Sequence, residues 1–228
     1  MIARGLIASA AFIAVMAGLS AWGWLATPPG AEFPVHWNAA GEPDRYGGKL
    51  EAFALLPGLA ILMSVIFAAA PLIDPRGRNL AQSGSVLLTV WIGTLGVLAA
   101  GQAALTLVAV GLIAPEGELA PRLVLLAVCA LLVVLGNALG KARPNWFVGV
   151  RTPWTLSSDK AWDVTHRWAG RGFVASGLIG GAALLLAPVP AGLAVFFALI
   201  AVTAVGSIAL SFLVWRSDPD RETYSDAG

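Results

Sequence analysis

The sequence predicts an all-α, polytopic integral membrane protein, built as a bundle of six transmembrane helices with the N- and C-termini in the cytoplasm. Three observations predict this fold class. Of the 228 residues, 58% are hydrophobic and only 12% are charged, whereas soluble domains carry roughly 25% charged residues. The mean hydropathy of +0.80 is too high for a water-soluble surface. Six separate stretches are long and apolar enough to cross a bilayer. We expect residues 1–228 to form a single membrane domain.

Each predicted span supplies close to the roughly 20 apolar residues that a bilayer core requires. The spans run from Gly5 to Ala26, Ala52 to Ile73, Val86 to Ile113, Ala120 to Leu139, Gly172 to Ala187 and Ala191 to Trp215. The first resembles a signal peptide in part, but Trp22 and Trp24 are typical of the aromatic belt that holds an uncleaved helix. Because Pro188–Pro190 is a short connection, the last two spans are expected to form an antiparallel hairpin.

The distribution of Lys and Arg predicts the orientation. If the N-terminus is cytoplasmic, only three of the 14 basic residues lie on the outer side of the membrane: Arg45, Lys49 and Arg122. Basic residues are enriched in cytoplasmic connections, so this bias favours both termini in the cytoplasm. The outer polar loop, residues 27–51, then faces the exterior and the inner polar loop, residues 140–171, faces the cytoplasm. The expected localisation is the plasma membrane, with multiple passes.

The outer polar loop contains candidate recognition residues. Pro34 favours an extended stretch in which His36 and Asn38 share one face, and Pro43-Asp44 predicts a turn. Three interpretations are open. The polar groups can satisfy one another at the helix ends, they can form a recognition loop, or a metal can bind His36 with nearby carboxylates, which is an unspecific ligand set. The recognition residues would be His36, Trp37, Asn38 and Asp44.

The inner polar loop combines aromatic and basic side chains. It holds four of the nine tryptophans, and its six Lys or Arg residues against two Asp residues leave a net charge of +4. Pro144-Asn145 and Thr152-Pro153 predict turns, and Ser158 or Asp159 can cap a helix from about Lys160. Within that helix, Asp163 is expected to pair with Arg167. This composition favours contact with anionic lipids. A docking surface for a cytoplasmic protein and a small-molecule or catalytic site are the alternatives.

Several classes of chemistry are disfavoured. His36 and His166 lie on opposite sides of the predicted membrane, so they cannot share a metal or divide acid and base roles. A single cysteine, Cys129, excludes an intramolecular disulfide and a thiolate zinc site. The net charge of +1 offers no basic field for direct nucleic-acid binding. We expect no enzymatic activity, no cofactor and no metal. Rival functions are a transporter or exporter, for which Gln102 and the Gly-rich spans would line a path, and a membrane enzyme acting on lipid headgroups.

Two motifs resemble a known family. The outer motif is Pro34-x-His36-Trp37-Asn38 with Gly41-x-Pro43-Asp44, which resembles a small uncharacterised domain that often precedes the second motif. The inner motif comprises Gly136-Asn137, Lys141-x-x-Pro144-Asn145, Gly149 to Leu156, Trp162 and Thr165-His166-Arg167. It is long and specific, and it resembles the SdpI family. Together the motifs cover about a quarter of the chain.

The resemblance implies a function that composition and spacing do not. SdpI-family membership implies a protein that protects its cell from a membrane-active, extracellular peptide toxin. It further implies signalling, in which a small cytoplasmic winged-helix repressor is held at the membrane. The inner-loop residues assigned to docking of that partner are Asn137, Asn145, Arg151, Trp154, Trp162, His166 and Arg167. The identity of the toxin does not follow from the resemblance.

Overall fold

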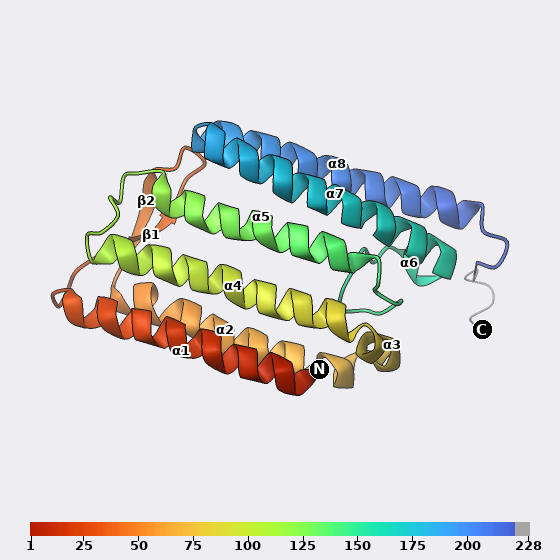
Figure 1. Cartoon of the computed structure of the whole chain (residues 1–228), viewed down its shortest axis with the longest axis horizontal. Helices are drawn as coiled ribbons and strands as arrows, with labels where there is room; N and C mark the ends of the chain where they lie inside the picture. Colours follow the sequence, from red (N-terminus) through yellow and green to blue (C-terminus); the bar gives the residue numbers. More distant parts are fainter. Residues whose placement is uncertain (222–228) are drawn as a thin grey trace.

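Six long helices run side by side along the longest axis of the molecule in the computed structural model, which describes residues 1–221 (Figure 1). All six are long and apolar enough to cross a membrane, so the predicted six-helix membrane protein is confirmed. The long helices are α1 (Ile2–Ala26), α2 (Lys49–Ile73), α4 (Gly84–Ala109), α5 (Leu119–Leu139), α7 (Asp159–Leu186) and α8 (Val189–Arg216). Two short helices, α3 (Gly77–Gln82) and α6 (Pro153–Leu156), precede α4 and α7.

Two of the predicted span boundaries are wrong. The fifth span was expected to start at Gly172, after a separate helix from about Lys160, but both belong to the single 28-residue helix α7. No proline interrupts this stretch, and its glycines are tolerated because Gly170 packs directly against α5. The third span was expected to reach Ile113, but α4 ends at Ala109 and Gly111 adopts a positive φ of 77°.

The N-terminus of α7 is capped as the sequence indicates. Ser158 is the N-cap, and its hydroxyl accepts a hydrogen bond from the backbone N–H of Ala161 (2.9 Å). Thr152-Pro153, expected to form a turn, begins the single helical turn α6, because Thr152 and Thr155 form a reciprocal capping box. Both caps lie in the inner polar loop, so they give this loop a defined path.

The outer polar loop contains a two-stranded antiparallel hairpin. Strand β1 (Phe33–Trp37) includes the predicted extended stretch, and it pairs with β2 (Pro43–Gly47), a strand that the sequence did not indicate. The turn expected at Pro43-Asp44 is therefore wrong, because these residues pair with β1 and the chain reverses just before them. The turn is closed by Asn38, whose side-chain oxygen accepts hydrogen bonds from the N–H groups of Ala40 (2.8 Å) and Glu42 (3.1 Å). Within residues 1–221, this hairpin is the only β-sheet structure.

The long helices pack in two groups of three. Helices α1, α2 and α4 contact one another, helix α7 lies between α5 and α8, and the contact of α4 with α5 joins the two groups. The α5–α7 crossing is exceptionally close: a Cβ atom at Gly136 would lie 2.4 Å from the carbonyl oxygen of Gly170. Glycine at both positions therefore lets the two backbones touch, as is common for helices in lipid.

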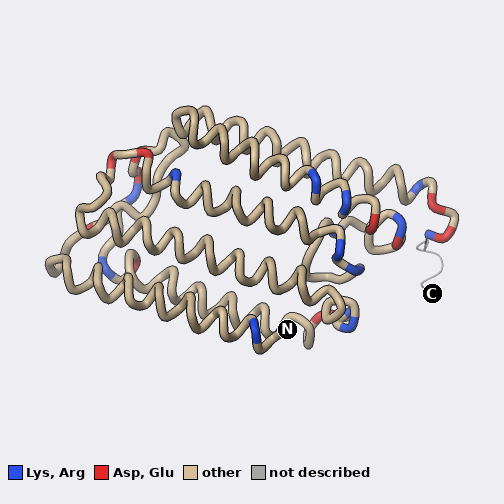
Figure 2. The backbone as a smooth tube through the Cα atoms, in the orientation of Figure 1, with Lys and Arg blue, Asp and Glu red and all other residues tan. Residues whose placement is uncertain are grey.

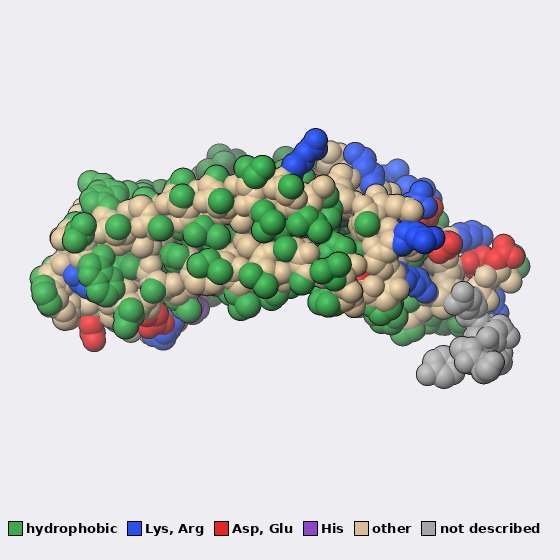
Figure 3. Space-filling view, turned by 90° about the horizontal axis from the view of Figure 1, so that it is seen from below, with side chains coloured by type: hydrophobic (Ala, Val, Ile, Leu, Met, Phe, Trp, Pro, Cys, Tyr) green, Lys and Arg blue, Asp and Glu red, His purple; other side chains and the backbone are tan. Residues whose placement is uncertain are grey.

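The two ends of the bundle differ in charge. The N-terminus, the end of α8 and residues 140–158 lie at one end, which we call the inner end, and most Lys and Arg residues gather there (Figure 2). The hairpin lies at the opposite, outer end. Hydrophobic side chains cover the surface between them (Figure 3). This arrangement matches a multi-pass membrane protein, whereas which end faces the cytoplasm stays a prediction.

Candidate functional site

The outer hairpin presents an exposed ion pair. His36 on β1 and Asp44 on β2 face each other across the strands, with 2.6 Å between His36 Nδ1 and Asp44 Oδ1. Their side chains are 61% and 41% exposed, so both are accessible to a ligand from outside the bundle. In residues 1–221 no group of three or more His, Cys, Asp and Glu side chains is arranged to hold a metal ion. The described residues therefore supply no set of three ligands that would support a metal site at His36.

The other two predicted recognition residues hold the hairpin in place. Trp37 Nε1 donates a hydrogen bond to the carbonyl oxygen of Pro115 in the α4–α5 connection (3.1 Å), and the side chain packs against the buried cluster that includes Ile113 and Ala120. Asn38 closes the turn, as described above. The hairpin is thus fastened over the outer ends of α4 and α5, which fixes where His36 lies.

An apolar groove lies beneath the hairpin. Its volume is about 590 Å³, and its walls come from β1 and from α2, α4, α5 and α8. The floor includes Leu56, Leu98, Leu105, Val124, Leu193 and Phe197, while His36 and Asn38 lie at the rim. The groove therefore combines an apolar interior, between the two groups of helices, with a polar edge at the outer end. Such a site suits a hydrophobic chain that carries a polar group.

The inner polar loop is organised around Asn145, which is fully buried. Its side-chain oxygen accepts hydrogen bonds from the N–H groups of Phe147 (2.8 Å) and Val148 (2.7 Å). Its amide nitrogen donates to the carbonyl oxygens of Arg143 (2.8 Å) and Val148 (3.2 Å). One side chain thus satisfies four buried backbone groups that have no helix or strand to pair with.

The loop is fastened to α7 by Trp162 and His166, both of which are buried. Trp162 Nε1 donates to the carbonyl oxygen of Ala142 (2.7 Å), and its ring stacks on His166 at 3.9 Å between centroids. The N–H of Val150 donates to His166 Nε2 (3.0 Å), while His166 Nδ1 lies 2.7 Å from the carbonyl oxygen of Trp162. These partners require a neutral imidazole with its proton on Nδ1.

The seven residues assigned to partner docking therefore fall into two sets. Asn145, Trp162 and His166 are buried and shape the loop, so a partner would not touch them directly. Arg151, Asn137 and Arg167 are exposed, and Trp154 is half-buried against Phe212 of α8, with 5.2 Å between ring centroids. Arg151 donates a hydrogen bond to the carbonyl oxygen of Trp146, which gives its guanidinium a defined direction.

The predicted pairing of Asp163 with Arg167 is wrong. The side-chain ion pairs in residues 1–221 are His36–Asp44, Arg45–Glu51 and Arg122–Glu118. Both Asp163 and Arg167 are exposed on the first turns of α7. Exposed i,i+4 pairs contribute only about 0.3–0.5 kcal/mol, too little to hold two flexible side chains together against solvation.

Two aspartates that the sequence analysis did not single out anchor the inner loop. Asp74, just after α2, accepts hydrogen bonds from the N–H of Arg76 (2.6 Å) and the N–H of Trp146 (3.0 Å). Asp218, just after α8, accepts one from the Ser158 hydroxyl (2.5 Å), and this bond lowers the pKa of the Asp218 carboxyl. Their position just after the end of a long apolar helix is the signal in the sequence that could have indicated them.

Gln102, the strongest polar group inside a span, joins two helices. It is fully buried, and its amide nitrogen donates to the carbonyl oxygen of Ala52 on α2 and to the hydroxyl of Thr106 (both 3.3 Å). Its bond to Ala52 is an interhelical hydrogen bond, which polar side chains within membrane helices commonly form. A transport path through Gln102 stays an untested prediction.

Comparisons with known proteins place both motifs in described families. Residues 141–211 match the model of the SdpI/YfhL protein family, and residues 11–61 match a domain of unknown function, DUF1648. The chain is 37% identical over 54 residues to "Immunity protein SdpI" of Bacillus subtilis (strain 168). That similarity spans 24% of this chain and about a quarter (26%) of the relative's length. No solved structure matches the chain.

The family match covers the part of the molecule that the inner motif organises. It begins in the inner polar loop, includes α6 and α7, and extends into α8. The other match covers most of α1, the outer hairpin and the first half of α2. The resemblance stated from the motifs is thereby confirmed: residues 141–211 of this multi-pass membrane protein match the SdpI/YfhL family, and residues 11–61 match DUF1648.

Proposed function

We propose that this protein is a membrane immunity protein that protects its cell from a membrane-active peptide toxin. The observation that carries the proposal is the SdpI/YfhL-family match, together with the 37% identity to an immunity protein. We further propose the groove beneath the hairpin as the toxin site. It lies beneath the outer hairpin, and its apolar walls, together with the polar side chains of His36 and Asn38, complement an amphipathic peptide.

A groove-filling substitution tests this function. Leu193 lines the groove from α8 and is half-buried, so Leu193→Trp should occupy its space. We expect cells that express this variant to lose most protection against the peptide at unchanged membrane abundance. Val195→Trp is the matched control, because Val195 lies on the same helix, outside the groove lining, and is 39% exposed. Full protection by both variants would remove the groove from the immunity mechanism.

His36 tests the polar rim of the same groove. His36→Ala should lower protection without changing abundance, because the exposed His36–Asp44 pair would no longer be available to polar groups of the peptide. Tyr46→Ala, an exposed change on β2, is the control. Equal protection by the two variants would leave only the apolar walls as the contact surface.

We also propose that the inner polar loop docks a small cytoplasmic winged-helix repressor. Arg151 supports this role, because it is exposed and its guanidinium is directed by the carbonyl oxygen of Trp146. A planar, forked guanidinium binds carboxylates in a way that Lys does not reproduce. The exposed Arg143 lacks such a direction and serves as a charge-only control.

The docking proposal predicts different results for two charge-conserving substitutions. Arg151→Lys should abolish repressor recruitment to the membrane, and Arg143→Lys should leave it unchanged. Trp154→Ala should behave like Arg151→Lys if both residues belong to one docking face. Recruitment is measured as the membrane-bound fraction of the repressor at matched expression. The docking proposal fails if Arg151→Lys leaves recruitment unchanged while charge-removing substitutions of Arg151 and of Arg143 lower it equally. The inner polar loop would then be an electrostatic anchor to lipid.

A further inference from the structure

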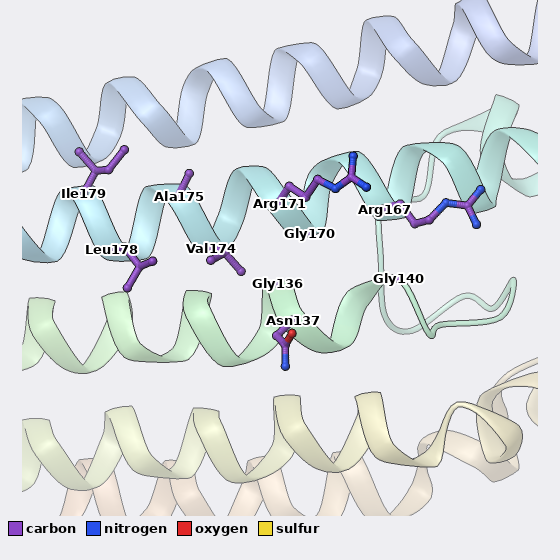
Figure 4. A pocket seen from close by; sticks show the side chains of 10 residues that line it. All are labelled: Gly136, Asn137, Gly140, Arg167, Gly170, Arg171, Val174, Ala175, Leu178 and Ile179. Atoms are coloured by element: carbon purple, nitrogen blue, oxygen red, sulfur yellow. The ribbon is translucent and has the colours of Figure 1, made fainter.

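A second cavity lies between α5 and α7 near the inner end, far along the helices from the outer groove. Its volume is about 590 Å³, and Figure 4 shows the ten residues that line it. Three glycines, at positions 136, 140 and 170, are among the lining residues. At Gly136 and Gly170 the backbones of α5 and α7 are in direct contact. The cavity therefore exists because this crossing lacks side chains, and its walls come from residues on either side of the crossing.

Two arginines supply the polar part of the cavity. Arg167 and Arg171 lie one turn apart on α7, a spacing that places their Cβ atoms about 5–6 Å from each other. Within residues 1–221 neither guanidinium forms an ion pair with an acidic side chain. Two like charges at this spacing repel each other. An anion bound between them would remove that repulsion and satisfy both sets of donors.

The polarity of the cavity runs along the helix axis. The Arg167 and Arg171 side chains extend toward the inner end, whereas Val174, Leu178 and Ile179 follow toward the middle of the bundle (Figure 4). Leu178 and Ile179 are 59% and 51% exposed on the apolar surface. Asn137, exposed on α5, also lines the cavity and is its third polar side chain. The lining of the cavity is thus cationic near the inner end and apolar toward the middle of the bundle.

We propose that this cavity binds an anionic phospholipid. Arg167 and Arg171 hold the phosphodiester, with Asn137 beside them, and an acyl chain lies along Val174, Leu178 and Ile179. The charge and the polarity both match: guanidinium groups bind phosphate oxygens as forked donors, and basic pockets between helices at the cytoplasmic side are suited to anionic headgroups. A soluble phosphate would use the arginines but leave the apolar wall uncovered. The proposal is independent of the immunity function.

The test measures binding of single lipids to the detergent-solubilised full chain by native mass spectrometry. Dioleoylphosphatidylglycerol is the probe, and dioleoylphosphatidylcholine, with the same acyl chains, tests the need for negative charge. The double substitution Arg167→Gln/Arg171→Gln should weaken phosphatidylglycerol binding about 30-fold, as expected for the loss of two basic contacts. Lys141→Gln/Arg143→Gln removes the same charge from exposed positions of the inner loop and should change binding less than about threefold.

A second variant and a competitor separate the alternatives. Ala175→Trp fills the cavity without changing charge and should weaken phosphatidylglycerol binding as well. Glycerol phosphate should not displace the lipid, since it lacks acyl chains. Equal effects of the two double substitutions would show non-specific attraction and overturn the site. Equal binding of phosphatidylcholine, efficient displacement by glycerol phosphate, or unchanged binding by Ala175→Trp would each overturn the phospholipid assignment.

Discussion

Single residues determine the shape of the inner polar loop more than its charges do. Asn145, Trp162 and His166 are buried, and each bonds to backbone groups of the loop. A loop without regular secondary structure must satisfy its buried N–H and C=O groups through side chains, and an unpaired one costs about 1–3 kcal/mol. This explains why the family motif contains polar and aromatic residues that a partner cannot reach.

Gly149 gives a residue-scale prediction. Its φ is +127°, and a Cβ atom there would lie 2.2 Å from His166 Nε2. Gly149→Ala should therefore destabilise the loop by about 2 kcal/mol or more, through backbone strain and loss of the Val150–His166 hydrogen bond. The measurement is the thermal unfolding midpoint in detergent, together with protease cleavage within residues 140–158.

Gly140 provides the control for Gly149. It has an ordinary helical φ of −66°, and a Cβ atom there would lie 3.3 Å from Cγ of the flexible Arg167 side chain and at an ordinary contact distance of 3.8 Å from Arg167 Cα. Gly140→Ala should leave both the unfolding midpoint and the cleavage unchanged. If the two alanine variants behave alike, the close approach of Gly149 to His166 does not limit the stability of the loop.

At the scale of elements, helix packing depends on where glycines meet a neighbouring backbone. Gly136 of α5 and Gly177 of α7 both face the partner helix, since Cβ atoms would lie 2.4 Å from the Gly170 carbonyl oxygen and 2.5 Å from that of Cys129. Other glycines in the spans, such as Gly96, face open space. In lipid, where apolar surfaces gain little by packing together, such close contacts provide much of the attraction between helices.

Substitutions at Gly136 and Gly96 should have opposite signs. Gly136→Ala should force α5 and α7 apart and lower stability by about 2 kcal/mol or more, as overpacking does. Gly96→Ala should be neutral or should stabilise α4 by up to about 1 kcal/mol, because alanine has the higher helix propensity. Unfolding midpoints of the two variants in the same detergent decide this. A neutral Gly136→Ala would show that the crossing can relax.

At the scale of the whole molecule, the N-terminus, the end of α8 and most basic residues lie at one end. An even number of spans requires the termini to share a side, and the charge bias predicts that this side is the cytoplasm. The same arrangement separates the outer groove from the inner loop and the α5–α7 cavity. A signal between them would have to pass through the helices, and α7 and α8 connect the outer end directly to the inner loop.

Topology is tested with single cysteines in a Cys129→Ala background. Ala39 lies at the exposed tip of the hairpin, and Ser157 follows α6 in the inner loop. Ala39→Cys should react with a membrane-impermeant maleimide in intact cells, and Ser157→Cys should react only after permeabilisation. Labelling of both in intact cells would overturn the six-span, N-inside arrangement.

The class of protein and the number of long helices could be predicted from the amino-acid sequence alone. These features depend on summed apolar content over about 20 residues, which no tertiary contact can alter. The cap at Ser158 and the extended stretch at Pro34 were also readable, because they depend on neighbouring residues. The two motifs indicated the family region from their residues alone.

Only the tertiary structure decided which of the motif residues can meet a ligand. His36 and Trp37 are adjacent in the sequence, yet one is exposed beside Asp44 and the other is fixed to the α4–α5 connection. Likewise Arg167 and Arg171 became a site only because Gly136 and Gly170 bring α5 against α7. Burial and cavities arise from contacts between residues distant along the chain, and neither local pattern nor composition contains that information.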